Sequence, residues 1–355
     1  MRNKVTMADI AKELGVSVPT VHRAINNLGR VSAKTQKRVL DKAKEMGYNT
    51  NIALGMLSSK EMFKAALILP NIHFYDDILK GFKASLSQYE LFQIDYDVLY
   101  TNEFNALEQV ALLESLIESE VRYSVIALPS AHPVILNPQI DRLVQSGTEV
   151  ITFDNDAPNS IRKIFIGPNG YVSGKVCAEL YNRILPEGAT VAVLPSFVTA
   201  VGLKERVRGF KDICAENNKL KIVGTFEFSD NEQDAYSVCK QVLSSIKPDA
   251  IYCNSMNGTQ GICKAIIDTN NVGKVFAIGY DLNASIKKHI KNGVLFGSIY
   301  QHPYMQGSNL ANIMMQICLG SFGVQEKNIY IKTMLVLNSN LDEFSEEYSL
   351  ALYAK

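Results

Sequence analysis

The sequence predicts an α/β protein in which a small N-terminal domain of three helices is joined to a large body of two parallel-sheet lobes. At 355 residues the chain is two to three times a common domain length. Helical periodicity dominates up to about residue 64, and short apolar runs then alternate with amphipathic stretches. Hydrophobic residues make up 47% and charged residues 20%, which is typical of a globular protein with substantial cores.

The charge is balanced overall but divided unevenly along the chain. Residues 1–60 contain 11 Lys/Arg against 4 Asp/Glu, whereas residues 61–355 contain 25 against 32. A compact basic head on an acidic body is typical of a protein whose one end contacts a polyanion.

Several classes are disfavoured by the same composition. No run approaches the roughly 20 apolar residues of a membrane span, and the first residues lack the apolar core of a signal peptide, so we expect a cytoplasmic protein. The cysteines form no C-x-x-C pair and are expected to be buried free thiols, with no metal site and no cofactor. They are Cys177, Cys214, Cys239, Cys253, Cys263 and Cys318.

Capping signals define three helices in the head. Thr6 is a good N-cap for a first helix that ends at Gly15, and Ser17 caps a second helix whose early Pro19 is tolerated in the first turn. Ser32 caps a third helix that runs from 33 to 46. A helix, a short glycine turn and a second helix on a basic background indicate a helix-turn-helix.

The second helix turns short polar side chains toward solvent, at Thr20, His22, Arg23 and Asn26. Such side chains suit phosphates and base edges in a major groove. The alternative is an ordinary three-helix domain with a solvated basic face.

In the body, strands are expected at 65–70, 125–129, 149–154, 191–195, 250–254, 275–280 and 297–301. Helices are expected at 76–89, 105–119, 171–184, 203–217, 232–246 and 258–269. This alternation predicts parallel sheets covered on both faces, with ligands at the carboxyl ends of the strands.

Carboxylates, amides, aromatic rings and one arginine gather at those strand ends. They are His73, Phe74, Tyr75, Asp154, Asn155, Arg206, Asn254, Ser255, Tyr280, Asp281 and Gln301. This mixture is typical of a site that binds a polyhydroxylated ring, because amides and carboxylates bind vicinal hydroxyls and aromatic rings cover C–H faces.

An enzyme is the main competing class. Asp154 and Asp156 lie two apart, a spacing that on a strand would put both on one face, and they could form an acid–base pair. The sequence contains no nucleophile elbow, P-loop, metalloprotease motif or dinucleotide motif, so we expect no catalytic residue. A transport protein would carry a signal peptide in place of the basic head.

The head sequence VTMADIAKELGVSVPTVHRAINNLGRVSAKTQKRVLDKAKEMGY resembles the DNA-binding domain of the LacI/GalR family of bacterial regulators. This resemblance implies that Val18, Pro19 and Arg23 face bases. It implies phosphate contacts for Thr6, Ser17, Thr20, Asn26, Ser32 and Thr35. His22 departs from the usual serine at its position.

The resemblance also implies a DNA-induced hinge helix in NTNIALGMLSSK, residues 49–60. Asn51 would cap it, Ala53 would form its small face, and Leu57 would insert into the minor groove. Gly55 weakens such a helix by roughly 1 kcal/mol relative to alanine.

From about 64 to 340 the chain resembles the type I periplasmic sugar-binding fold, through FYDDILKGF, TFDNDAP, KERVRGF and AIGYD. The resemblance implies that Phe74 and Tyr75 stack on a sugar ring and that Tyr280 and Ser255 form walls. Hydroxyl groups would be bound by Asp154, Arg206, Asp281 and Gln301.

We therefore expect a helix-turn-helix domain at 1–49, a hinge at 50–63, an effector-binding and dimerisation domain at 64–340 and a tail at 341–355. The expected function is that of a homodimeric repressor of operator DNA, controlled by a sugar or polyol and not bound to a membrane. Candidate dimer surfaces are 76–90, 105–119 and 300–320. The alternative effectors are a non-sugar metabolite and a phosphoprotein.

Overall fold

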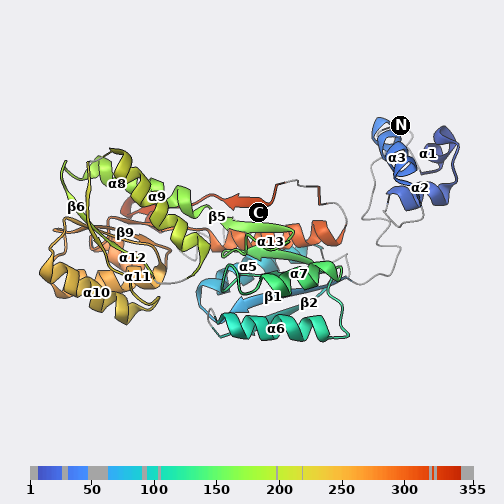
Figure 1. Ribbon diagram of the computed structural model, residues 1–355. Helices are drawn as coiled ribbons and strands as arrows, with labels where there is room; N and C mark the ends of the chain where they lie inside the picture. The colour runs from blue at the N-terminus through green and yellow to red at the C-terminus, as the bar shows by residue number, and fades with distance from the viewer. Residues whose placement is uncertain are drawn as a thin grey trace.

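The computed structural model describes residues 7–25, 31–46, 63–89, 94–102, 105–196, 199–217, 219–319, 322–323 and 326–344. Within these residues the chain forms a three-helix head and a body of two α/β lobes (Figure 1). The predicted fold class is confirmed.

The head contains the three expected helices, α1 (Met7–Leu14), α2 (Val18–Ile25) and α3 (Ala33–Glu45). Gly15 has a φ of +63°, which lets the chain turn tightly after α1. The helices share a small apolar core of Ile10, Ala11, Val21, Ala24, Val39 and Ala43. Because this core uses the inner face of α2, the outer face of α2 remains in solvent.

The first lobe, which we call the N-lobe, is built on a six-stranded parallel sheet of order β11-β5-β4-β3-β1-β2. Its strands are β1 (Phe63–Pro70), β2 (Ile94–Thr101), β3 (Val125–Leu128), β4 (Glu149–Phe153), β5 (Ile164–Pro168) and β11 (Asn328–Ile331). Its helices are α5 (Phe74–Leu86), η1 (Ser87–Tyr89), α6 (Ala106–Glu118), α7 (Asn137–Gln145) and α13 (Pro303–Cys318).

The second lobe, the C-lobe, repeats this plan with the strand order β12-β10-β9-β8-β6-β7, except that β12 runs antiparallel to β10. Its strands are β6 (Thr190–Leu194), β7 (Lys221–Thr225), β8 (Ala250–Cys253), β9 (Phe276–Tyr280), β10 (Gly297–Tyr300) and β12 (Met334–Leu337). Its helices are α8 (Gly170–Ile184), α9 (Val201–Asn217), α10 (Glu232–Ser245), α11 (Met256–Asp268), α12 (Ala284–Lys291) and η2 (Asn338–Phe344).

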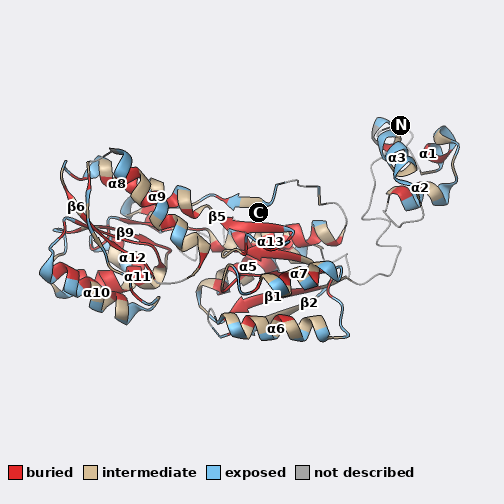
Figure 2. Ribbon diagram, in the orientation of Figure 1, coloured by how far each residue is buried: buried red, intermediate tan, exposed pale blue. Residues whose placement is uncertain are grey.

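Alternating strand residues form a core on each face of each sheet. Leu67 and Leu69 of β1 pack toward α5 and α13, while Ala66 and Ile68 pack toward α6 and α7. Figure 2 shows the result as buried sheets between helices whose outer surfaces are exposed. Because both faces are buried, these strands appear in the sequence as continuous apolar runs.

The helix pairs α5–α13 of the N-lobe and α8–α9 of the C-lobe pack closely through glycine. A Cβ added at Gly307 of α13 would lie 1.9 Å from the carbonyl oxygen of Ile78 in α5. A Cβ added at Gly174 of α8 would lie 1.9 Å from the carbonyl oxygen of Arg206 in α9. Each pair therefore approaches more closely than any larger residue at these positions would allow.

The described chain passes between the lobes three times, between β5 and α8, between β10 and α13, and between β11 and β12. The seven predicted strands and six predicted helices are all present. The sequence interpretation missed five strands, of which β2 (IDYDVLYT) and β7 are edge strands with polar or exposed side chains. These two edge strands lack the apolar run by which the central strands were recognised.

The first described strand of the body begins at Phe63, and the last described element, η2, ends at Phe344. Leu341 of η2 is buried and Phe344 packs on the C-lobe core. All six cysteines are buried and free, as predicted. Among the described helices, none has both the length and the apolar character needed to span a bilayer.

Candidate functional site

A cavity of about 100 Å³ lies where the carboxyl ends of the two sheets face each other. Both lobes line it, which is the position expected for a ligand in parallel α/β folds. Its lining residues are Ile72, Phe74, Tyr75, Asp154, Asn155, Ala200, Leu203, Arg206, Asp230, Ser255, Met256, Asn257, Asp281 and Gln301. Eight of the eleven predicted effector residues are among them.

Asp154 and Asp281 occupy equivalent places in the two lobes. Asp154 follows β4 with a φ of +57°, and Asp281 follows β9 with a φ of +64°. The Asp154 N–H donates to Ile166 O in the next strand at 2.9 Å, and the Asp281 N–H donates to Ile299 O at 2.8 Å. Both carboxylates therefore leave the sheet edge through the same unusual backbone turn.

In the N-lobe, Asp154 is held by a phenol and an amide. The Tyr75 hydroxyl donates to Asp154 Oδ2 at 2.7 Å, and Asn155 Nδ2 donates to the same oxygen at 3.0 Å. Tyr75 is itself buried, with the Phe74 ring edge-on to it at 5.3 Å. These residues supply apolar surface together with one carboxylate.

In the C-lobe, a chain of hydrogen bonds joins Asp281, Gln301 and Arg206. Gln301 Nε2 donates to Asp281 Oδ1 at 2.7 Å, and Gln301 Oε1 accepts from Arg206 Nη2. Arg206 Nη1 donates to Asn254 O at 2.8 Å, and the guanidinium lies 4.4 Å from the centre of the Tyr280 ring. The arginine is thus fixed from two sides, while its buried Nε has no hydrogen-bond partner among the described residues.

Burial dominates the electrostatics of both carboxylates. It raises the pKa of Asp281 to about 6, although Arg206 and Gln301 act in the opposite direction. Burial also raises the pKa of Asp154, opposed by the Tyr75 hydrogen bond and by Arg206. A ligand that donates hydrogen bonds to these oxygens would stabilise their ionised form.

A third carboxylate, that of Asp230, lines the cavity but was not predicted from the sequence. Asp230 Oδ1 accepts from the Ser255 hydroxyl at 2.7 Å, and Ser255 in turn caps α11. Asn257 Nδ2 donates to Asp230 O at 2.9 Å. Recognition of the edge strand β7 would have marked Asp230 as another polar residue beyond a strand end.

Three predicted effector residues do not line the cavity. The His73 side chain is 82% exposed and pairs with Asp76, because it precedes α5 on the outer surface. Tyr280 is fully buried beneath Arg206, and so it supports the arginine from behind. Asn254 lines a neighbouring groove of about 380 Å³ and contributes only its carbonyl oxygen to the arginine.

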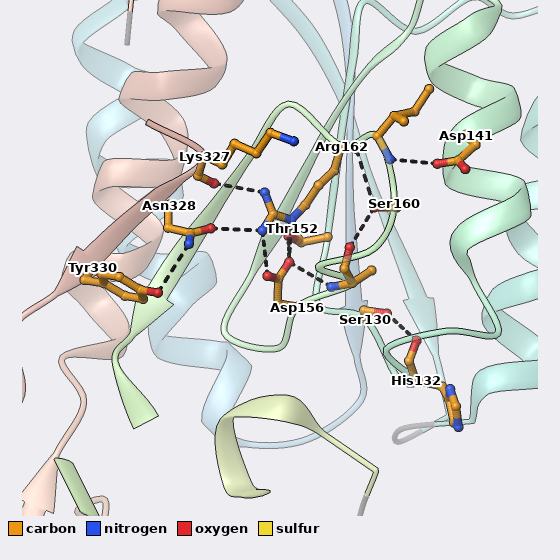
Figure 3. A network of polar contacts seen from close by, with 12 residues as sticks. Ser130, His132, Asp141, Thr152, Asp156, Ser160, Arg162, Lys327, Asn328 and Tyr330 are labelled. Atoms are coloured by element: carbon orange, nitrogen blue, oxygen red, sulfur yellow. Dashed lines mark hydrogen bonds and ion pairs between the residues drawn. The ribbon is translucent and has the colours of Figure 1, made fainter. Parts of the chain in front are cut away.

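Asp156 does not act together with Asp154, because it forms a buried ion pair of its own (Figure 3). Arg162 Nη2 donates to Asp156 Oδ2 at 2.6 Å, and Arg162 also donates to Lys327 O and to Asn328 Oδ1. The pair therefore ties the β4–β5 connection to β11. The arrangement does not support the acid–base pair considered from the sequence.

The head presents a polar surface on α2 and α3. Ser17 and Thr20 join their hydroxyls at 2.8 Å at the start of α2, and Ser32 and Thr35 do so at 2.9 Å at the start of α3. Val18, Pro19, His22 and Arg23 are exposed on α2. Hydroxyls beside helix N-termini suit phosphate oxygens.

The other expected DNA contacts, Thr6, Asn26, Asn51, Ala53 and Leu57, lie outside the described residues. The expected hinge helix therefore stays a prediction.

Two family models match the chain. The model of bacterial regulatory proteins of the lacI family matches residues 6–51, and the model of the periplasmic binding protein domain matches residues 67–321.

Two regulators and one solved structure are similar over most of the chain. The chain is 36% identical to the HTH-type transcriptional regulator DegA of Bacillus subtilis, over 70% of this chain and 72% of that protein. It is 27% identical to the sucrose operon repressor of Streptococcus mutans, over 69% and 72%. A solute-binding protein of an ABC transporter from Burkholderia graminis, solved with D-arabinose, aligns with a TM-score of 0.74 and 26% identity, over 80% of this chain and 98% of that chain.

Proposed function

Because the chain belongs to the LacI family of bacterial regulatory proteins, it is a DNA-binding transcriptional regulator, and we propose that it is a repressor controlled by a small carbohydrate or polyol bound between its lobes. The observation that carries the effector proposal is the cavity itself, which joins Asp154 and Tyr75 of one lobe to Asp281 and Arg206 of the other. A ligand that contacts both lobes favours one arrangement of them over another. The protein has no catalytic role in this proposal.

Effector binding can change the DNA affinity because the lobes that bind the effector are joined to the DNA-binding head in one chain. An effector shifts the DNA affinity only by the difference between its affinities for the two lobe arrangements. Loss of operator affinity on binding would make the effector an inducer, and a gain would make it a co-repressor. Both outcomes agree with control through the cavity.

Thermal unfolding of the full chain tests the effector proposal, with a panel of pentoses, hexoses and inositols as probes. A ligand at 100 times its Kd adds roughly 2.7 kcal/mol to the stability. We expect one clear stabiliser whose effect is reduced in Asp281→Asn. A flat response to the whole panel would contradict a carbohydrate effector and favour a non-sugar metabolite or a phosphoprotein.

The DNA-binding surface is tested at Arg23, which is exposed in the last turn of α2. Arg23→Ala should weaken operator binding by roughly 10-fold to 100-fold and flatten the base preference, because arginine reads guanine through two hydrogen bonds. The operator is first selected from random duplexes. Lys37→Ala on α3 is the control and should weaken binding to all duplexes about equally. Unchanged selectivity in Arg23→Ala would remove the base-reading role.

We further propose a cytoplasmic homodimer that reads two half-sites of a near-palindrome, because two-fold proteins match two-fold sites. Of the three expected dimer surfaces, α5 and α13 largely pack on each other within the protomer. Leu107 of α6 is 74% exposed and leaves the 105–119 surface available. Sedimentation of the full chain with Leu107→Glu tests this surface, since a monomer is expected if α6 forms the contact.

A further inference from the structure

The charges that line the cavity are unbalanced. Asp154, Asp230 and Asp281 contribute three carboxylates, and Arg206 is the one cation among the described lining residues. Asp154 and Asp230 both raise the pKa of Asp281 through repulsion, so the three carboxylates lie close enough to interact. An anionic ligand would add to this repulsion in a site where burial weakens the screening by water.

The single cation is already engaged by the protein. Two of its three nitrogens donate to Asn254 O and Gln301 Oε1, and its face covers the Tyr280 ring. Its third nitrogen, Nε, is buried and has no partner within the part of the chain that the structure describes. Phosphate is bound best by two parallel donors, whereas one N–H suits the oxygen of a hydroxyl or an ether.

The carboxylates of Asp154 and Asp281 can each accept further hydrogen bonds from a ligand. Asp154 uses Oδ2 for its bonds to Tyr75 and Asn155, and Asp281 uses Oδ1 for its bond to Gln301. No bond within the described chain engages the other oxygen of either carboxylate. Hydroxyl groups can donate to these oxygens, but the oxygens of a phosphate ester are acceptors near neutral pH.

Two lysines line the neighbouring groove, and none is among the described residues that line the cavity. Lys204 and Lys211 lie there with Glu227, and Lys211 Nζ donates to Thr225 Oγ1 at 2.9 Å. Leu203 lines both the groove and the cavity. A phosphate that extended from the cavity would therefore need this groove.

We propose that the cavity selects an uncharged polyol and rejects the phosphate ester of the same molecule. This inference rests on the proposed function and specifies its ligand class. A cell containing this regulator would then sense the free compound and not its phosphate ester.

Isothermal titration of the full chain with matched pairs tests the inference. The probes are D-ribose, D-arabinose, D-glucose, D-galactose and myo-inositol, each beside its monophosphate. For the member that binds, we expect the parent compound to bind at least 100-fold more tightly than its phosphate ester. We also expect any residual binding of the ester to strengthen from pH 8 to pH 6, because an anion favours protonation of Asp281.

Asp154→Asn and Asp281→Asn are the diagnostic variants. Each removes one charge, and asparagine tolerates the left-handed backbone at both positions. We expect the preference for the parent compound to fall by about 10-fold in each variant, whatever happens to the absolute affinity. Asp342→Asn, which changes an exposed residue outside the cavity, should leave the preference unchanged.

Three outcomes would overturn the inference. A phosphate ester that binds more tightly than its parent would refute the charge argument and leave the carbohydrate effector intact. Ester binding that is lost in Lys204→Met or Lys211→Met would assign the phosphate to the neighbouring groove, with the same consequence. Absence of binding by every compound would refute the proposed effector, and this inference with it.

Discussion

The N-lobe and the C-lobe share a strand order and place an aspartate at the same point, but they surround it differently. The helix after the first strand of the N-lobe is α5, which brings the Tyr75 phenol to Asp154. The corresponding helix of the C-lobe is α9, which brings the Arg206 guanidinium to the Gln301–Asp281 pair. One architecture thus provides a ring on one side of the cavity and a cation on the other.

Removal of the Arg206 cation from the C-lobe side of the cavity should lower the effector affinity more than any change on the N-lobe side. Arg206→Ala leaves Gln301 Oε1 and Asn254 O without their donors and leaves Asp281 without its compensating charge. We expect effector affinity to fall on the order of 100-fold, or about 3 kcal/mol. Isothermal titration measures the loss. The control is Arg208→Ala, which lies on the same helix, is exposed and pairs with Glu205.

The close helix pairs provide a second comparison between the lobes. Gly174→Ala must push α9 away from α8, and Gly307→Ala must push α13 away from α5, because each new Cβ meets a backbone oxygen. We expect each to destabilise its lobe by roughly 2 kcal/mol in denaturant unfolding. Gly202→Ala in α9 has no atom closer than 4.0 Å to its new Cβ, so helix propensity should stabilise it by up to about 1 kcal/mol. Equal stability of all three variants would contradict the packing argument.

The buried carboxylate of the C-lobe should make stability depend on pH. Burial raises the pKa of Asp281 to about 6, so above that pH the folded chain contains a buried ionised carboxylate that costs stability. Below about pH 4 the carboxyl is protonated in the folded and the unfolded chain, and this cost is absent. Asp281→Asn should therefore gain stability over the native chain at pH 8, on the order of 2 kcal/mol, and lose this gain as the pH falls through 6 to 4. Thermal unfolding from pH 4 to 8 measures the difference. A gain that is independent of pH would show that Asp281 carries no such penalty.

Removal of the Tyr75 hydroxyl on the N-lobe side should have the smallest effect on effector affinity. Tyr75→Phe keeps the buried ring but removes the 2.7 Å bond to Asp154. We expect effector affinity to fall roughly 5-fold to 10-fold, close to the 1 kcal/mol of an ordinary hydrogen bond. Tyr100→Phe, at an exposed position of β2, is the matched control. A loss as large as that of Arg206→Ala would remove the distinction between the lobes.

The sequence predicted those parts of the molecule whose physical signals are local. Apolar strands such as 65–70 and caps such as Ser17 are visible in a few consecutive residues, and both are present in the structure. Asp154, Asp281 and Arg206 could be placed at one cavity because parallel strands end at a common edge. The exposed edge strands, and with them Asp230, escaped because their alternating pattern is short and partly polar.

Side-chain direction could not be predicted from the sequence. Tyr280 and Asp281 are neighbours, yet the ring lies beneath Arg206 and the carboxylate faces the cavity. Likewise Asp154 and Asp156 separate because Arg162 holds the second carboxylate against β11. These outcomes depend on partners that lie far away in the chain, so no local pattern contains them.

The buried cysteines make the protein suited to optical measurement of lobe motion. Burial raises the pKa of Cys214 and of Cys318 to about 11 and that of Cys177 to about 12, so their reactive thiolate forms are scarce near neutral pH. Thiol-reactive fluorophores would therefore attach to one cysteine introduced on the surface of each lobe and leave the native ones unlabelled. Energy transfer between the two dyes would then report the opening and closing of a single molecule as effector or operator is added.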